Sequence, residues 1–144
     1  MTLPVWRPAL AALACAAALV FASPSMAAMI NLKAELKASN EVPPNDSKGA
    51  GSLTATYDDA KKTLSWKGNI SGLSGPATAA HFHAGEPGKN GGVVIPIAGA
   101  DKGVFEGSAT LTDAQAAEMM AGRWYVNIHT AANKAGEIRG QLTK

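Results

Sequence analysis

Apolar and polar residues alternate in a series of short segments that begins at residue 30 and continues to the end of the chain. The pattern is clearest at the start, where an apolar residue stands at every second position from Ile30 to Leu36. A period of two is typical of a β-strand with one face on the core and one in solvent. Further segments of strand character lie at 52–57, 64–70, 78–84, 93–97, 104–109, 124–130 and 137–142. The sequence therefore predicts a mostly β chain of about eight strands.

One segment has helical character instead. Thr112 is a good N-cap, and Gln115 follows three residues later, which is the spacing of a capping box. Residues 113–121 suit a helix, and Gly122 is well placed to end it. About eight strands with one short helix near 113–121 predict an antiparallel β-sandwich or a flattened Greek-key barrel. Trp66 lies in the apolar row of its strand, so we expect it in the core.

The first 27 residues have the layout of a secretory signal peptide. Arg7 supplies a small positive charge, an unbroken apolar run of 14 residues follows at 9–22, and small residues lead up to Ala27. The run is shorter than a membrane span, which favours a signal peptide cleaved after Ala27. An uncleaved anchor is the alternative interpretation. A lipid anchor at Cys15 is disfavoured because that cysteine lies inside the apolar run.

Cleavage would leave residues 28–144 as one secreted domain, periplasmic or extracellular. It would also remove the single cysteine, so the mature chain would have no thiol and no disulfide, which excludes thiol catalysis and iron–sulfur clusters. The mature chain would carry 12 basic against 11 acidic residues, without the clustered lysines and arginines of a nucleic-acid-binding protein. No second apolar run is long enough for a transmembrane segment.

Three groups of motifs stand out along the chain. They are Glu41-Val42-Pro43-Pro44 with the strand after it, Ala80-His81-Phe82-His83-Ala84-Gly85 with the glycine-rich loop after it, and Trp124–Thr130 with Gly136–Leu142. Together they resemble the CHRD (chordin) domain family over roughly residues 30–143. Chordin repeats this domain, and many exported bacterial proteins contain it alone. The resemblance implies a single domain that binds or interacts with a partner, protein or surface, outside the cytoplasm.

All three histidines of the chain, His81, His83 and His129, lie in these motifs. Phe82 is the large apolar residue between the first two, so we expect it to face the core and the two histidines to share the opposite face. The apolar row of 124–130 likewise leaves His129 on the side away from the core. The polar residues expected on that side are Asn127, Glu137, Arg139 and, from the glycine-rich loop, Glu86.

The last two strands are expected to pair as a hairpin. Residues opposite each other must share a face. The simplest register then pairs His129 with Glu137, Asn127 with Arg139 and Tyr125 with Gln141. The glycine-rich loop at 85–92 has no helix after it, so it is not a phosphate loop. We expect it to lie over the histidine face.

The histidines permit several interpretations. Residues i and i+2 on a strand point the same way about 6.5–7 Å apart, so His81 and His83 can converge on one ion if His129 approaches them. Imidazole suits zinc or copper, and the site would resemble that of superoxide dismutase, another β-sandwich with a His-x-His element. Glu137 is then the expected partner of the second nitrogen of His129. A hydrogen-bond network and a catalytic base are the other interpretations.

Two functions follow from these residues. The first is a non-catalytic, extracytoplasmic binding or interaction protein of the CHRD type. The alternative is a periplasmic copper- or zinc-binding protein that uses His81, His83 and His129. An enzyme is disfavoured because the sequence offers no pair of nucleophile and base. The sequence names neither a partner nor a metal.

Overall fold

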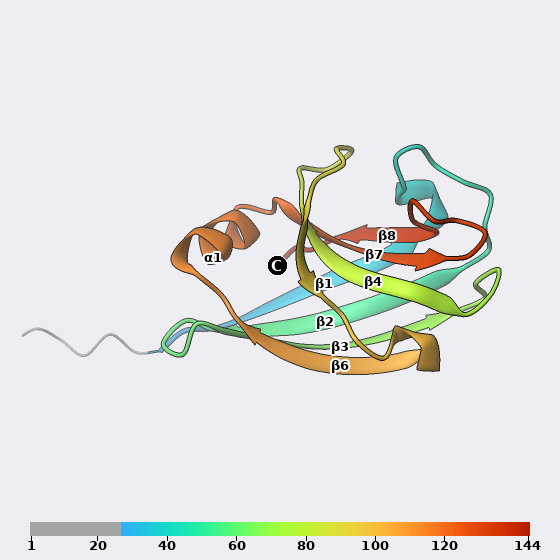
Figure 1. Ribbon diagram of the computed structural model, residues 1–144. Coiled ribbons are helices and arrows are strands. Elements are labelled where there is room, and N and C mark those ends of the chain that lie inside the picture. The colour runs from blue at the N-terminus through green and yellow to red at the C-terminus, as the bar shows by residue number, and fades with distance from the viewer. Residues whose placement is uncertain (1–26) are drawn as a thin grey trace, which may run out of the picture.

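The alternating segments of the sequence form the strands of a computed structural model that describes residues 27–144 (Figure 1). The predicted signal peptide falls almost wholly outside the described residues. The strands are β1 (Met29–Lys37), β2 (Ala50–Asp58), β3 (Thr63–Ser71), β4 (Ala77–Ala84), β5 (Val93–Pro96), β6 (Val104–Thr110), β7 (Trp124–Thr130) and β8 (Ile138–Gln141). The helices are α1 (Asp113–Met120) and two 3₁₀ turns, η1 (Ala38–Asn40) and η2 (Ala100–Lys102).

All eight strands belong to one antiparallel sheet in the order β5-β4-β7-β8-β1-β2-β3-β6. The sheet curls on itself, so that β4, β7 and β8 lie over β1, β2 and β3 in a nearly closed, barrel-like arrangement (Figure 1). This confirms the predicted mostly β, antiparallel fold of about eight strands with one short helix.

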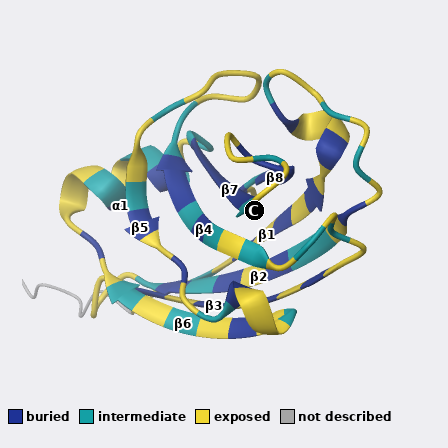
Figure 2. Cartoon of the chain, turned by 45° about the vertical axis from the view of Figure 1, so that its right-hand side comes forward, coloured by how far each residue is buried: buried dark blue, intermediate teal, exposed yellow. Residues whose placement is uncertain are grey.

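The core lies inside the curl, where the apolar rows of the two halves meet (Figure 2). Phe82 of β4 is fully buried and faces inward, as its place between two histidines predicts. The ring of Trp66 in β3 packs edge-on against it, with the two ring centroids 5.1 Å apart. Trp66 is therefore a core residue, which confirms the prediction from its strand pattern.

Within β7 and β8 the hairpin has the predicted register. Tyr125 lies opposite Gln141, and Asn127 lies opposite Arg139. Glu137, the predicted partner of His129, precedes β8, and its N–H donates to the carbonyl of Ile128. Trp124 and Ile138 are both buried in the core, as this register requires. The register follows from the sequence because a shift by one residue would move a whole apolar row to the other face.

The residues predicted to cap the α-helix stand at its two ends. The hydroxyl of Thr112 accepts a hydrogen bond from the Gln115 N–H, and the Gln115 side chain accepts one from the Thr112 N–H, which completes the capping box. Gly122 adopts a left-handed φ of 74° just after the helix. In the described part of the chain, none of the helices has the length and apolar character of a membrane-spanning helix.

The side of β7 and β8 that faces away from the core is covered by loops. Asn127 is only 3% exposed there and Arg139 only 2%. Two segments cover it, residues 38–47 and the glycine-rich loop at 85–92. The loop is joined to this face by hydrogen bonds from Arg139 to Lys89 and Asn90. Alternation assigns side chains to a face, whereas long-range loop packing decides what covers that face.

Candidate metal site

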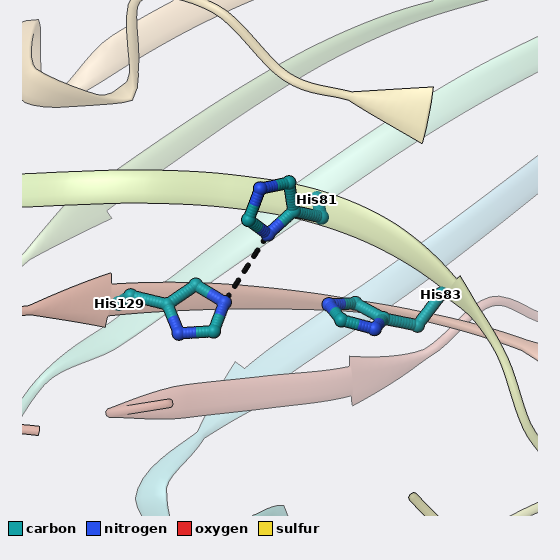
Figure 3. A group of neighbouring side chains, drawn as sticks. All are labelled: His81, His83 and His129. Carbon is teal, nitrogen blue, oxygen red and sulfur yellow. Dashed lines mark hydrogen bonds between the residues drawn. The ribbon is translucent and has the colours of Figure 1, made fainter. Parts of the chain in front are cut away.

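The three histidines come together on the outer face of two neighbouring strands. His81 and His83 belong to β4, and their side chains point away from the core because they flank the inward-facing Phe82. His129 belongs to β7, which pairs with β4 so that His129 lies opposite Ala79. Figure 3 shows the three rings gathered over these strands. Each histidine has one ring nitrogen that lies within 4.8 Å of a ring nitrogen of each of the other two.

The rings are close enough for direct contact. Nδ1 of His81 lies 3.2 Å from Nε2 of His129, a hydrogen bond drawn in Figure 3. The ring centroid of His81 is 5.1 Å from that of His129 and 5.4 Å from that of His83. Nitrogens that bind one ion at about 2.0–2.1 Å must themselves lie a few Å apart. The spacing therefore suits a shared ligand.

Backbone carbonyl groups fix the orientation of two of the rings. Nδ1 of His83 lies 2.9 Å from the carbonyl oxygen of Gly91, and Nδ1 of His129 lies 2.8 Å from that of Lys134. A carbonyl oxygen only accepts, so both Nδ1 atoms carry the proton. In the neutral rings, Nε2 of each histidine then presents a lone pair toward the cluster. Carbonyl partners of this kind orient the histidines of metal sites in proteins.

His83 has a nitrogen that its surroundings leave unpaired. Its side chain is buried, with 8% of the residue exposed, and Nε2 has no hydrogen-bond partner among the described residues. Leaving a buried polar atom unpaired costs about 1–3 kcal/mol. A metal ion bound to this lone pair would remove that cost. The observation fits a ligand better than it fits a purely structural histidine.

The pKa values of the cluster favour its neutral form. Burial lowers the pKa of His81, and the neighbouring His129 and His83 lower it further. Burial also lowers the pKa of His83, and the neighbouring His129 lowers it further, against the opposing effects of the hydrogen bond to Gly91 and of the nearby Asn127 side chain. Only neutral imidazole binds a metal ion, so these shifts keep both rings in the binding form at neutral pH. The donor set of three imidazole nitrogens suits zinc or copper.

Tyr125 packs beside the cluster and ties it to Arg139. The Tyr125 ring stacks on His83 with the centroids 4.8 Å apart and the planes 4° from parallel. The guanidinium carbon of Arg139 lies 3.4 Å from the centroid of the same ring. Because β7 lies between β4 and β8, Tyr125 separates His83 from Arg139. Arg139 thus holds His83 in place indirectly and does not touch the histidines.

The remaining predicted members of the polar cluster have separate positions. Asn127 lies beneath the cluster, donates to Oε1 of Glu41 at 3.3 Å, and leaves its own Oδ1 without a partner among the described residues. Glu86 is exposed and lies in the covering loop, where its backbone carbonyl accepts from Arg139. The group of three histidines contains neither residue.

Glu137 does not partner His129 as predicted, because the carbonyl of Lys134 takes that role. Glu137 stands before the first residue of β8 and after Gly136, whose φ is 140°, so the strand alternation does not extend to it. Its carboxylate is fully buried elsewhere. The groups that donate to it are the N–H of Ser74, the hydroxyls of Ser47, Ser74 and Thr130, and the amide of Asn133.

These hydrogen bonds explain the acidity of Glu137. Burial alone would raise its pKa, but the donors from Ser47, Ser74 and Thr130 outweigh burial and lower the pKa to about 2. At Glu41 burial prevails and raises the pKa to about 7, because the hydrogen bonds from Asn127 and the Val42 backbone and the attraction of Arg139 are too weak to offset it. Glu41 was part of a sequence motif, but nothing local in the sequence showed that it would be buried beneath the histidine face.

The comparisons with known proteins agree with the motifs. No curated protein and no solved structure matches the chain. The family model of the CHRD domain matches residues 32–142, which include every strand from β2 to β8 and most of β1. The matched region contains all three histidines and the loops around them. Because the match covers most of the chain, the chain belongs to the CHRD domain family.

Proposed function

We propose that this CHRD-domain protein is a non-catalytic, exported binding protein whose ligand is a transition-metal ion, copper or zinc. The ligands are His81, His83 and His129. Two observations carry the proposal. Nε2 of His83 is buried with no hydrogen-bond partner among the described residues, and one ring nitrogen from each of the three histidines lies within 4.8 Å of one from each of the others. The proposal unites the binding role implied by the family with the chemistry of the histidine cluster.

Each histidine has a defined part in such a site. His83 and His129 offer Nε2, because carbonyl groups hold the proton on Nδ1. His81 faces them with Nδ1, which donates to His129 in the absence of an ion. A neutral imidazole carries its proton on either nitrogen, so His81 can free Nδ1 by moving that proton to Nε2. Three nitrogens leave a fourth position for water or for a group from a partner.

A purely structural network explains the cluster less well. Such a network would be expected to satisfy its buried atoms, yet Nε2 of His83 has no partner within the described chain. The proposal assigns no reaction to the site, because the hydrogen bonds of the three rings go to backbone carbonyls and to one another. No hydroxyl or thiol nucleophile takes part in them.

Export is the remaining part of the proposal. The apolar leader with its small-residue cleavage site supports removal of residues 1–27. Membership of the CHRD family, a family of extracytoplasmic-type domains, supports the same placement. We place the mature protein in the periplasm or outside the cell.

Thermal unfolding of the mature domain tests the metal proposal. A ligand present at 100 times its Kd stabilises the native state by about 2.7 kcal/mol. Zinc or copper should therefore raise the Tm by several degrees in a domain of this size. The double variant His81→Ala with His83→Ala should lose that rise while it keeps its β-sheet circular dichroism.

Magnesium serves as the control ion, because it prefers oxygen ligands and should not raise the Tm. Two results would contradict the proposal. One is the absence of any rise in the wild-type domain with both zinc and copper. The other is an equal rise in the double variant, which would place the ion elsewhere on the protein and leave the histidines with a hydrogen-bonding role.

A further inference from the structure

A cleft lies beside Arg139, outside the histidine cluster. It has a volume of about 360 Å³ and lies between the η1 segment and the glycine-rich loop. Arg139 and Gln141 of β8 line it together with Glu41, and Val42 and Pro87 add apolar surface. Its two walls are tied together, because the amide of Asn90 donates to the carbonyl of Val42 at 2.9 Å. The cleft contains no histidine.

Arg139 is the dominant charge in this cleft. The residue is 2% exposed, and its guanidinium donates to the Lys89 carbonyl at 2.6 Å, to Oδ1 of Asn90 at 3.1 Å and to the Glu86 carbonyl at 3.4 Å. A guanidinium has five N–H donors, so these three hydrogen bonds do not use all of them. Within the described chain, no carboxylate lies within the 4.0 Å of a salt bridge to Arg139.

The positive charge of Arg139 is therefore only partly offset. Its hydrogen-bond acceptors are neutral, the uncharged Tyr125 ring lies against one face of the guanidinium, and the one acidic group that lines the cleft is Glu41. Glu41 attracts Arg139 from a distance, but burial raises the pKa of Glu41 to about 7, so much of it is uncharged at neutral pH. Buried charges in proteins are normally paired. A bound anion would complete the pairing that the protein leaves unfinished.

We propose that this cleft binds a small carboxylate, with the guanidinium of Arg139 as its main recognition element. The planar guanidinium matches the planar carboxylate and forms charge-assisted hydrogen bonds with it. The hydroxyl of Ser39 lines the cleft and is a second donor. The volume equals that of roughly a dozen waters of about 30 Å³ each. It therefore suits a carboxylate with a short apolar or hydroxylated body in contact with Val42 and Pro87.

This inference is independent of metal binding. The Tyr125 ring lies between His83 and Arg139, so the carboxylate would not contact the histidine cluster. The test can therefore be done on the mature domain in the presence of a chelator. Failure of the metal proposal would leave this inference intact, and the reverse also holds.

An NMR titration of the ¹⁵N-labelled mature domain tests the inference, with propionate as the probe. Propionate should give saturable shifts of the Gly88 amide, the Gln141 side chain and the Nε–H of Arg139. Propionamide has the same shape without the charge and should give none. Arg139→Lys should weaken propionate binding at least about tenfold, as the loss of a charge-assisted hydrogen bond predicts. Arg123→Lys is the matched control, because Arg123 is half-exposed and paired with Glu118.

Glu41→Gln gives a second test that does not disturb Arg139. It removes the remaining negative charge from the cleft, so propionate should bind more tightly than to the wild-type domain. Inorganic phosphate is the competing anion. Three results would overturn the inference: equal binding of propionate and propionamide, unchanged propionate binding in both Arg139→Lys and Glu41→Gln, or binding of phosphate without binding of propionate.

Discussion

His83 acquires the properties of a metal ligand from the residues around it. A histidine between two strand residues has no fixed chemistry, but Gly91 holds the proton of His83 on Nδ1 and the Tyr125 ring supports one face of the imidazole. Burial lowers the pKa and keeps the ring neutral. The sequence predicted which face His83 occupies. It could not predict the carbonyl partner, because that partner is a backbone atom in a loop.

Glu137 gives a prediction about pH. Its pKa of about 2 lies below the value of 4.5 expected for an unfolded chain, so its charge stabilises the fold above pH 4.5. This stabilisation is lost as the pH falls through 2, and its size is about 3 kcal/mol at pH 7. Glu137→Gln should lower the free energy of unfolding by about that amount at pH 7, and the difference from the wild type should shrink between pH 5 and pH 2.

Urea denaturation of both proteins at a series of pH values checks this prediction. Glu106→Gln is the matched control, because Glu106 is an exposed glutamate whose ion pair with Lys67 should contribute little. Parallel stability curves for the wild type and Glu137→Gln from pH 7 to pH 2 would show that the carboxylate does not contribute as its hydrogen bonds indicate.

At the scale of elements, the glycine-rich loop contacts both the histidine cluster and Arg139. Gly91 binds His83 through its carbonyl, and its N–H lies 3.1 Å from the hydroxyl of Tyr125. The loop also accepts hydrogen bonds from Arg139. Gly91 must be glycine here, because a Cβ atom would lie 1.5 Å from the carbonyl oxygen of Ala84. The next residue, Gly92, has open space around its Cβ position.

These two glycines provide a matched pair of variants. Gly91→Ala should displace the loop and remove the carbonyl from His83, so zinc affinity should fall roughly 10–100-fold, as for other changes to groups that orient metal ligands. Gly92→Ala should bind zinc as the wild-type domain does. Isothermal titration calorimetry measures both. Equal zinc affinities for the two variants would mean that the loop does not orient the site.

The strands and the hairpin register could be predicted from the sequence, but the covering of the sheet could not. Period-two alternation fixes which residues share a face, and so it predicted that Asn127 pairs with Arg139 and that Phe82 faces inward. The position of Glu137 was missed because alternation ends with the strand. The segments that bury Asn127 and Arg139 carry no periodic pattern, so their packing depends on contacts distant in sequence.

At the scale of the whole molecule, the predicted leader can be tested separately from the sheet. The first strand begins at Met29, two residues after Ala27, so removal of residues 1–27 would leave every described strand complete. Intact-mass analysis of the protein recovered from the exported fraction should show the loss of residues 1–27, within a residue or two. Recovery of a mature protein that still contains Cys15 would exclude this processing.

The curled sheet gives the histidine face its rigidity. β4 and β7 are neighbours inside the sheet, and their inward residues Phe82 and Val126 are fully buried in the core. The outward residues of the same strands are therefore held at fixed spacing. A binding site on such strands would be pre-organised, so the proposed ion would need little rearrangement of its ligands.

Metal analysis of the protein purified from its native compartment tests the central claim most directly. Purification must avoid chelators and histidine tags, and the double variant His81→Ala with His83→Ala is purified in parallel. We expect about one copper or zinc ion per wild-type chain and none in the variant, as a site with three histidine ligands predicts. Equal metal content in the two proteins, or none in either, would contradict the assignment of a metal site to the histidines.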